Sequence, residues 1–456
     1  MTRYEDFVAS KLSRPAPDGL EPVGEPWPRL FPFQADLTRW ALRRGRSAIF
    51  ADTGLGKTSM ELTWAREVSA QTGGDVLILT PLAVAPQVVA EAVMLGDLVS
   101  FADKDPTPGV HVLNYDRLHR IDPSAYAGVV LDESSCLKHQ DSSTFSRLCE
   151  AFRDTPYRLA ATATPAPNDW TELGTHAEFL GVCTRAEMLS EFFCHDGGET
   201  QDWKLKGHAR GAFWRWVSSW AALIKRPSDL GYEDDRYALP PLEVVERVVA
   251  GAAVSEGALF VTVAETLQER RAARKASIPS RVAACVADVN AEPGESWVIW
   301  CDLNAEGDAL SAAMPDAVEV RGSDDPDAKE ARLAGFASGK HRILISKPSI
   351  CGWGLNWQHA ARMAFVGVTD SWEAYYQAVR RCWRFGQKRP VRVHVYASEA
   401  EGAVTANLAR KEAEATALGA ALSAETRAAV FESVRGSKPV HLDYSPSTPM
   451  EVPSWL

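Results

Sequence analysis

Two stretches of the chain carry residue types that bind phosphate. The first, ADTGLGKTS from Ala51 to Ser59, places two glycines just ahead of Lys57 and Thr58. Glycines leave room for backbone N–H groups to point at phosphate oxygens. The lysine can reach β- and γ-phosphates, and the threonine hydroxyl can bind Mg²⁺. The pattern predicts a phosphate-binding loop between a strand and a helix, with Thr53, Gly54, Gly56, Lys57 and Thr58 as contact residues.

An acidic pair follows a second apolar run, AGVVL, at Asp132 and Glu133. Two carboxylates at a strand tip are costly without a cation, so Asp132 suits Mg²⁺, directly or through water. Glu133 suits positioning and deprotonating an attacking water. An ordinary exposed strand end explains the pair alone equally well, but Lys57 and Thr58 in the same sheet favour the catalytic interpretation. Upstream, the amide of Gln34 can pair with the donor and the acceptor of an adenine edge.

The second phosphate-binding stretch is QAVRRCWRFGQ, residues 377–387. On a helix, Gln377, Arg381 and Arg384 would form one stripe. Arginines this close repel one another unless an anion faces them, so Arg381 and Arg384 are candidates for stabilising charge on a departing γ-phosphate. A solvated basic helix face is the alternative, which the aromatic neighbours Trp383 and Phe385 disfavour.

Two further segments allow two interpretations each. In ATATP, the hydroxyls of Thr162 and Thr164 could link the γ-phosphate to its surroundings, or the segment could be a tight turn. In SICGWGLNW, backbone amides around Gly354 could hold a phosphate. A plain glycine turn explains that segment equally well.

Composition limits the class of protein. The 456 residues exceed one ordinary core, and the formal net charge of −11 argues against a protein that coats nucleic acid through overall charge. Eight cysteines without a CxxC pair predict reduced thiols, and the spacing of His176, Cys183, Cys194 and His195 fits no standard zinc pattern. Without a membrane-length apolar run or a signal-peptide pattern, we expect a soluble, cytoplasmic protein with no membrane partner.

Alternating apolar runs and amphipathic stretches predict an α/β protein with two parallel-sheet lobes. The expected parts are an N-terminal arm (1–28), a first lobe (29–181), a helical, basic, tryptophan-rich insertion (182–239), a second lobe (240–398), and a C-terminal helix and tail (399–456).

The insertion holds four tryptophans and the cations Lys204, Lys206 and Arg210. These cations could guide DNA, and the tryptophans could stack on bases. A solvated face and a packed core are the simpler alternatives, which we favour from the residue pattern alone.

Taken in order, these segments resemble the superfamily-two helicases and translocases, in particular short phage- or prophage-type members of the SWI/SNF-like branch. The resemblance covers about residues 29–397. It is carried by LFPFQ, ADTGLGKT, LILTPLAVAPQVVAEA, LDESSCLKHQ, ATATPAPND, VIWCD, SICGWGLNW and QAVRRCWRFGQ. Ser134 and Ser135 replace the usual Ala/Ser-His, and Ala163 replaces a usual glycine.

The resemblance implies two RecA-like lobes with ATP between them and a nucleic-acid-dependent ATPase that moves along DNA in bacterial or phage-infected cytoplasm. Gly354 and Gln377 would join the nucleotide site, and Thr80, Pro81 and the turn at Gly354 would approach the DNA backbone. Phage replication or recombination proteins are conceivable partners. An RNA-dependent ATPase of the same fold, or an ATP-gated clamp with slow hydrolysis, are the alternatives.

Overall fold

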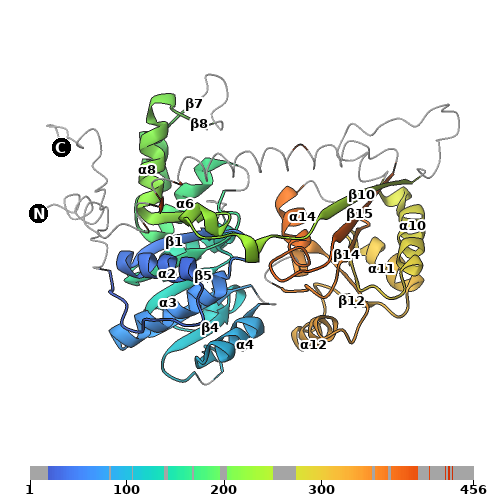
Figure 1. The fold of residues 1–456 in the computed structure, drawn as a ribbon, viewed down its shortest axis with the longest axis horizontal. Helices are drawn as coiled ribbons and strands as arrows, with labels where there is room; N and C mark the ends of the chain where they lie inside the picture. Colours follow the sequence, from blue (N-terminus) through green and yellow to red (C-terminus); the bar gives the residue numbers. More distant parts are fainter. Residues whose placement is uncertain are drawn as a thin grey trace, which may run out of the picture. The chain divides into compact units, whose positions relative to one another are not determined.

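Apolar runs of the sequence form the strands of two parallel sheets (Figure 1). The computed structural model describes residues 19–81, 84–104, 106–137, 142–166, 169–195, 203–249, 274–351, 355–367 and 371–398, and single residues between 410 and 434. The chain divides into two units, residues 1–234 with 419–456 and residues 235–418. None of the described helices is both long and apolar enough to cross a bilayer.

In the described part of the first unit, seven strands pair in the order β3-β4-β2-β5-β6-β1-β9, all parallel. They are β1 (Arg46–Ala51), β2 (Asp75–Thr80), β3 (Val99–Phe101), β4 (Val110–Asn114), β5 (Tyr126–Asp132), β6 (Tyr157–Ala161) and β9 (Ala221–Ile224). Because a parallel sheet is covered on both faces, its central strands are almost wholly apolar and buried.

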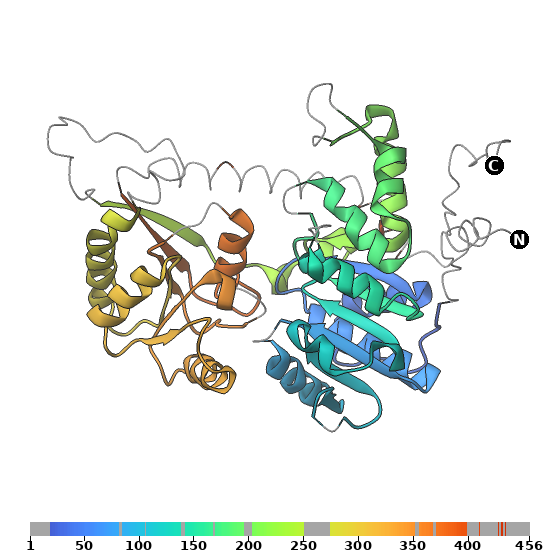
Figure 2. The same ribbon diagram turned by 180° about the vertical axis from the view of Figure 1, so that it is seen from behind.

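Helices cover this sheet on both sides, as the opposite views of Figures 1 and 2 show. Helices α2, α3 and α4 are neighbours, while α6 contacts β6 and β1 and carries α5 and α7 beside it. The helices are α2 (Pro32–Arg44), α3 (Lys57–Thr72), α4 (Ala85–Leu95), α5 (Ser143–Ala151), α6 (Leu173–Leu180), α7 (Arg185–Phe192) and α8 (Arg210–Trp220).

The segment predicted as a helical insertion contributes to the first sheet. Its helices α7 and α8 are present, with a short antiparallel pair, β7 (Phe193–His195) and β8 (Trp203–Leu205). Strand β9, which the sequence did not predict, pairs with β1 and so forms the edge of the sheet beside the loop that precedes Lys57. Trp214, Trp216 and Trp220 are buried in the core of the first unit, which favours packing over base stacking for these three.

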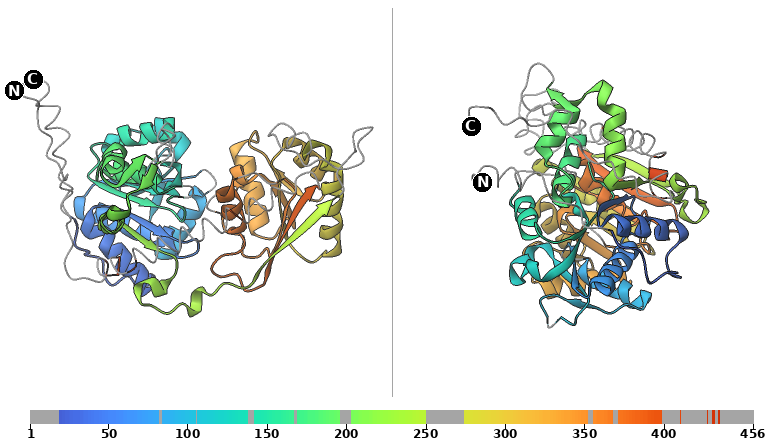
Figure 3. Two further views of the ribbon diagram at one scale, coloured as in Figure 1. Left: turned by 90° about the horizontal axis from the view of Figure 1, so that it is seen from above. Right: turned by 90° about the vertical axis from the view of Figure 1, so that its left-hand side faces the viewer.

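In the described part of the second unit, six parallel strands pair in the order β10-β15-β14-β11-β13-β12. They are β10 (Leu242–Val249), β11 (Trp297–Trp300), β12 (Val318–Val320), β13 (Ile343–Ser346), β14 (Arg362–Phe365) and β15 (Val391–Ser398). Helices α10 (Ile278–Ala291), α11 (Asn304–Ala313), α12 (Pro326–Ala337), α13 (Pro348–Cys351) and α14 (Trp372–Val379) lie on both sides of the sheet (Figure 3).

The predicted α/β architecture with two parallel sheets is confirmed. The predicted C-terminal helix over 399–435 and the first 18 residues of the predicted arm lie outside the continuously described residues.

Candidate active site

The loop that joins β1 to α3 turns through two glycines with positive φ. Gly54 has φ 91° and Gly56 has φ 76°, which side chains rarely tolerate. A Cβ on Gly56 would also lie 2.3 Å from Nε2 of Gln34. Lys57 begins α3 and donates from Nζ to the carbonyl oxygen of Ala51 at 3.0 Å, so it bridges the two ends of the loop. The N-terminus of α3, where the helix dipole favours anions, is thereby held at the end of β1.

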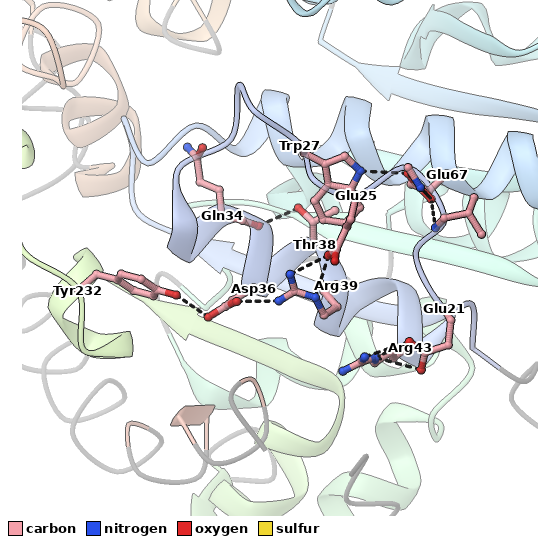
Figure 4. A network of polar contacts seen from close by, with 12 residues as sticks. Glu21, Glu25, Trp27, Gln34, Asp36, Thr38, Arg39, Arg43, Glu67 and Tyr232 are labelled. Carbon is pink, nitrogen blue, oxygen red and sulfur yellow. Dashed lines mark hydrogen bonds and ion pairs between the residues drawn. The ribbon is translucent and has the colours of Figure 1, made fainter. Parts of the chain in front are cut away.

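Gln34 lies on α2, one turn before Thr38 (Figure 4), and supports the same loop. Its Nε2 donates to the carbonyl oxygen of Leu55 at 2.8 Å, and its Oε1 accepts from the N–H of Phe31 at 2.9 Å. The NH₂ group and the carbonyl oxygen of this side chain can each form one more hydrogen bond. The contact of Gln34 with adenine therefore stays a prediction. The structure adds another role, because this buried amide ties α2 to the loop between β1 and α3.

Asp132 and Glu133 follow β5 at the sheet edge where β1 also ends. Both are buried, with 4% and 7% of their surface exposed. Thr80, at the end of β2, donates to Oδ2 of Asp132 at 3.1 Å, and Thr162, just after β6, donates to Oε2 of Glu133 at 3.4 Å. Parallel strands have their carboxyl ends at one edge, so β2, β5, β6 and β1 bring these groups together.

Glu133 has an unusual backbone. Its φ of 53° is the one positive value among the described non-glycine residues. Such a conformation costs free energy and persists where surrounding contacts enforce it, often at functional sites. The next residue, Ser134, lies 3.2 Å from Nε2 of the buried His176, oxygen to nitrogen. The chain around Asp132 and Glu133 is therefore held in place by β5 on one side and by the contact of Ser134 with His176 on the other.

The carboxylates of this site share a local excess of negative charge. Burial, and next the charge of Glu133, raise the pKa of Asp132 to about 7, while Lys57 and the hydrogen bond from Thr80 act in the opposite direction. Burial also raises the pKa of Glu61 on α3 well above its usual range, with Asp132 as the next cause. A cation at this sheet edge would lower both pKa values.

The residues present fit a Mg²⁺ ion. Thr58 in the first turn of α3 and Asp132 at the end of β5 supply hard oxygen atoms, which this ion prefers. Within the described ranges, no three His, Cys, Asp or Glu side chains are grouped so as to hold a metal by themselves. Such a small number of protein ligands suits Mg²⁺, which keeps several waters and takes further oxygen ligands from phosphates.

No protein-family model matches this chain, and no curated protein matches it. Its function must therefore be argued from the residues and geometry of each unit.

The arginines of the second unit do not lie on the predicted helix. Helix α14 ends at Val379, and Arg381 and Arg384 lie in the turns that follow, so the predicted helical stripe is wrong. The carbonyl oxygen of Arg381 accepts from the N–H of Trp357 at 2.9 Å, which draws the chain out of the helix.

Gln377, Arg381 and Arg384 nevertheless meet. Arg381 donates from Nη2 to Oε1 of Gln377 at 2.8 Å. Both arginines donate to the carbonyl oxygen of Leu355, from Nη1 at 3.2 Å for Arg381 and 3.1 Å for Arg384. Arg381 is 1% exposed, while Arg384 is half-buried. Leu355 directly follows Gly354, which lies outside the described residues.

The residues predicted to contact nucleic acid fall into different environments. Thr80 is fully buried against Asp132, so its side chain belongs to the acidic site in this arrangement, and Pro81 beside it is half-buried. Lys206 donates to the carbonyl oxygens of Ser190 and Glu191, each at 2.8 Å, and so caps the end of α7.

Lys204 and Arg210 are exposed. The guanidinium of Arg210 also lies 5.9 Å from the ring centre of Trp170. These two cations are the ones of the predicted set with side chains at the surface, and their contact with DNA stays a prediction.

The sequence did not indicate Glu61, and it indicated His176 as a possible metal ligand but not as the partner of Ser134. Glu61 is an acid within the mostly apolar stretch MELTWA, and this contrast could have indicated a buried acid. His176 lies 42 positions from the Ser134 hydroxyl that it contacts, and nothing in the local sequence of either residue indicates the pair.

Proposed function

We propose that this chain is an ATP- and Mg²⁺-dependent DNA translocase or helicase with two RecA-like lobes. The observation that carries the proposal is the convergence of Lys57 with Asp132 and Glu133 at one edge of the first sheet. A loop that binds phosphate beside two buried acids is the arrangement that hydrolysis of a nucleoside triphosphate needs.

In the proposed reaction, the backbone amides around Gly54 and Gly56 hold the phosphates, and Lys57 leaves the Ala51 carbonyl to neutralise the β- and γ-phosphates. Thr58 and Asp132 would hold Mg²⁺, which would supply positive charge to the phosphate oxygens. Glu133 orients a water and takes its proton as the water oxygen bonds to the γ-phosphorus. The bond from that phosphorus to the β,γ-bridging oxygen breaks, and the electron pair leaves with ADP.

In the proposed mechanism, Arg381 and Arg384 of the second unit would stabilise the charge that develops as the γ-phosphate leaves. Stabilisation of developing charge by such arginines is worth orders of magnitude in rate. Gln377 positions Arg381 by accepting from its guanidinium. In this mechanism, closing and opening of the two lobes during each ATP cycle moves the chain along the phosphate backbone without reading bases.

The proposal is tested by separating nucleotide binding from hydrolysis. Lys57→Ala should weaken ATP binding at least about tenfold and abolish hydrolysis, because the phosphate charge loses its partner. Glu133→Gln should bind ATP normally and hydrolyse it about 10²-fold or more slowly. A fluorescent ATP analogue and phosphate release report the two steps.

Two exposed residues of the first unit provide matched controls, Lys104→Ala and Glu150→Gln. Both should resemble the wild type in each assay. Hydrolysis at the wild-type rate by Glu133→Gln would contradict the assigned chemistry.

A further inference from the structure

Glu61 is a buried acid of the phosphate-binding helix to which the mechanism above gives no role. It lies on α3 three positions after Thr58 and four after Lys57, so all three side chains share one face of the helix. Only 1% of its surface is exposed. A carboxylate in this position has to be explained, because glutamate is almost never fully buried without a partner.

Neither carboxylate oxygen of Glu61 has a hydrogen-bond partner among the described residues. Glu67, on the same helix and almost equally buried, is by contrast an acid with hydrogen-bond donors around it. It accepts from the N–H groups of Val23 and Gly24, each at 2.9 Å, and from Nε1 of Trp27 at 3.0 Å. Glu61 and Glu67 are almost equally buried, but they differ in their hydrogen-bond partners. The carboxylate oxygens of Glu61 can therefore still accept hydrogen bonds from a bound group.

Of the charged groups that act on Glu61, Asp132, Lys57 and Glu133 belong to the candidate active site, and Glu91 lies on α4. Asp132 has the largest effect, followed by Lys57, Glu133 and Glu91. Lys57 is the one cation in this set, so the acids outnumber the bases. The group that would satisfy Glu61 must therefore carry positive charge, or donate hydrogen bonds from a positively charged centre.

The acids around Glu61 do not form a metal site by themselves. The described residues contain no group of three or more His, Cys, Asp and Glu side chains that could hold an ion. Neither carboxylate oxygen of Glu61 is hydrogen-bonded to Asp132. Mg²⁺ keeps several of its waters in protein sites, and a metal-bound water points its hydrogens outward at acceptors such as carboxylates.

We propose that Glu61 is a positioning residue of the Mg²⁺ site, which accepts hydrogen bonds from waters on the ion held by Thr58 and Asp132. This inference rests on the proposed function, since it assigns a further residue to the same site. Glu61 fixes the orientation of the hydrated ion without touching it, and so sets how much Mg²⁺ the protein needs to bind nucleotide.

The test is Glu61→Gln, which keeps the shape of the side chain and removes its charge. The Mg²⁺ concentration for half-maximal binding of a fluorescent ATP analogue should rise about 10- to 100-fold, as for loss of other residues around a metal's ligands. Analogue binding in EDTA should stay at the wild-type level. The metal-free variant should unfold at the same or a higher urea concentration, because an unpartnered buried charge has been removed.

Glu150→Gln, an exposed acid on α5, is the control and should leave the Mg²⁺ requirement unchanged. An unchanged requirement in Glu61→Gln would overturn the inference and make Glu61 a neutral buried acid. A loss of fold in Glu61→Gln would instead assign it a structural role. Glu61→Asp keeps the charge but shortens its reach, so its Mg²⁺ requirement should lie between those of the wild type and Glu61→Gln.

The outcomes also separate this inference from the proposed function. Wild-type protein that fails to bind the analogue with saturating Mg²⁺ would remove the nucleotide site itself. If the wild-type protein binds and hydrolyses ATP but Glu61→Gln leaves the Mg²⁺ requirement unchanged, only the role of Glu61 would be excluded.

Discussion

Arg381 and Arg384 differ in environment although three positions separate them. Arg381 is buried and donates to Gln377 and to Leu355, whereas Arg384 is half-buried and shares the Leu355 carbonyl. Removing Arg381 would leave buried acceptors behind, so its loss should affect the fold of the second unit as well as chemistry. Arg384 is therefore the better residue with which to test the proposed role in hydrolysis.

Arg384→Ala should lower the rate of ATP hydrolysis by about 10³-fold, the range seen when such an arginine is lost. ATP binding and the urea midpoint of unfolding should change little. Arg384→Lys is the matched control: it keeps the charge but loses the planar fork, and it should recover only part of the rate. A normal rate in Arg384→Ala would exclude this arginine from the reaction.

His176 should make the stability of the first unit depend on pH. Burial lowers the pKa of His176 to about 4. Between about pH 6.5 and pH 4 the unfolded chain therefore binds a proton that the folded chain does not, so stability falls as the pH is lowered through this range. The loss should reach at most about 3 kcal/mol.

His176→Gln keeps a polar group beside Ser134 and cannot titrate. The free energy of unfolding, measured in urea at several pH values, should therefore fall less steeply toward acid pH in the variant than in the wild type. Equal slopes would show that His176 is not the group responsible.

At the scale of the elements, the segment before α2 binds α3 through a buried acid. Glu67 accepts three N–H groups of residues 23–27 near one end of α3 (Figure 4), and Gln34 binds the loop at the other end. Asp36 of α2 also accepts from the hydroxyl of Tyr232 at 2.6 Å. These contacts fix α2 and α3 relative to each other, and with them the loop that precedes Lys57.

Glu67→Gln should destabilise the first unit by about 2 to 4 kcal/mol, because the amide nitrogen would face N–H donors in a buried position. Urea unfolding measures this. Glu21→Gln is the control, since Glu21 pairs with Arg43 while 74% of its side chain is exposed, and it should cost about 1 kcal/mol or less. Equal losses in the two variants would rule out the anchoring role of Glu67.

The sequence predicted the elements that are continuous apolar runs, such as β1, β2 and β5, because burial on both faces leaves a clear pattern. It missed β9, whose four residues follow the tryptophan-rich helix α8 and could equally continue it. It also extended α14 too far. No glycine or proline interrupts residues 380–385, and the helix ends because Arg381 makes contacts distant in sequence.

At the candidate site, too, some residues could be predicted from the sequence and others could not. Asp132 and Glu133 could be predicted because residues at the ends of parallel strands gather at one edge. Glu61 could not, since its lack of hydrogen-bond partners arises from the packing of α3 against the sheet. The burial of Thr80 likewise depends on Asp132, which lies 52 positions later in the chain.

For the whole molecule, the net charge of −11 means that any contact with DNA must be local. Among the cations predicted to contact nucleic acid, Lys204 and Arg210 are exposed on the first unit, whereas Lys206 caps a helix. Binding through a few phosphate contacts should be independent of base sequence and should weaken as salt is added.

Whether the protein is a DNA motor can be measured as the steady-state rate of ATP hydrolysis with no nucleic acid, single-stranded DNA, duplex DNA, forked DNA and RNA. We predict a low rate alone and a marked rise with DNA, which declines with added salt and is absent in Glu133→Gln. Hydrolysis that no nucleic acid changes, or that RNA alone stimulates, would contradict the assignment of a DNA motor.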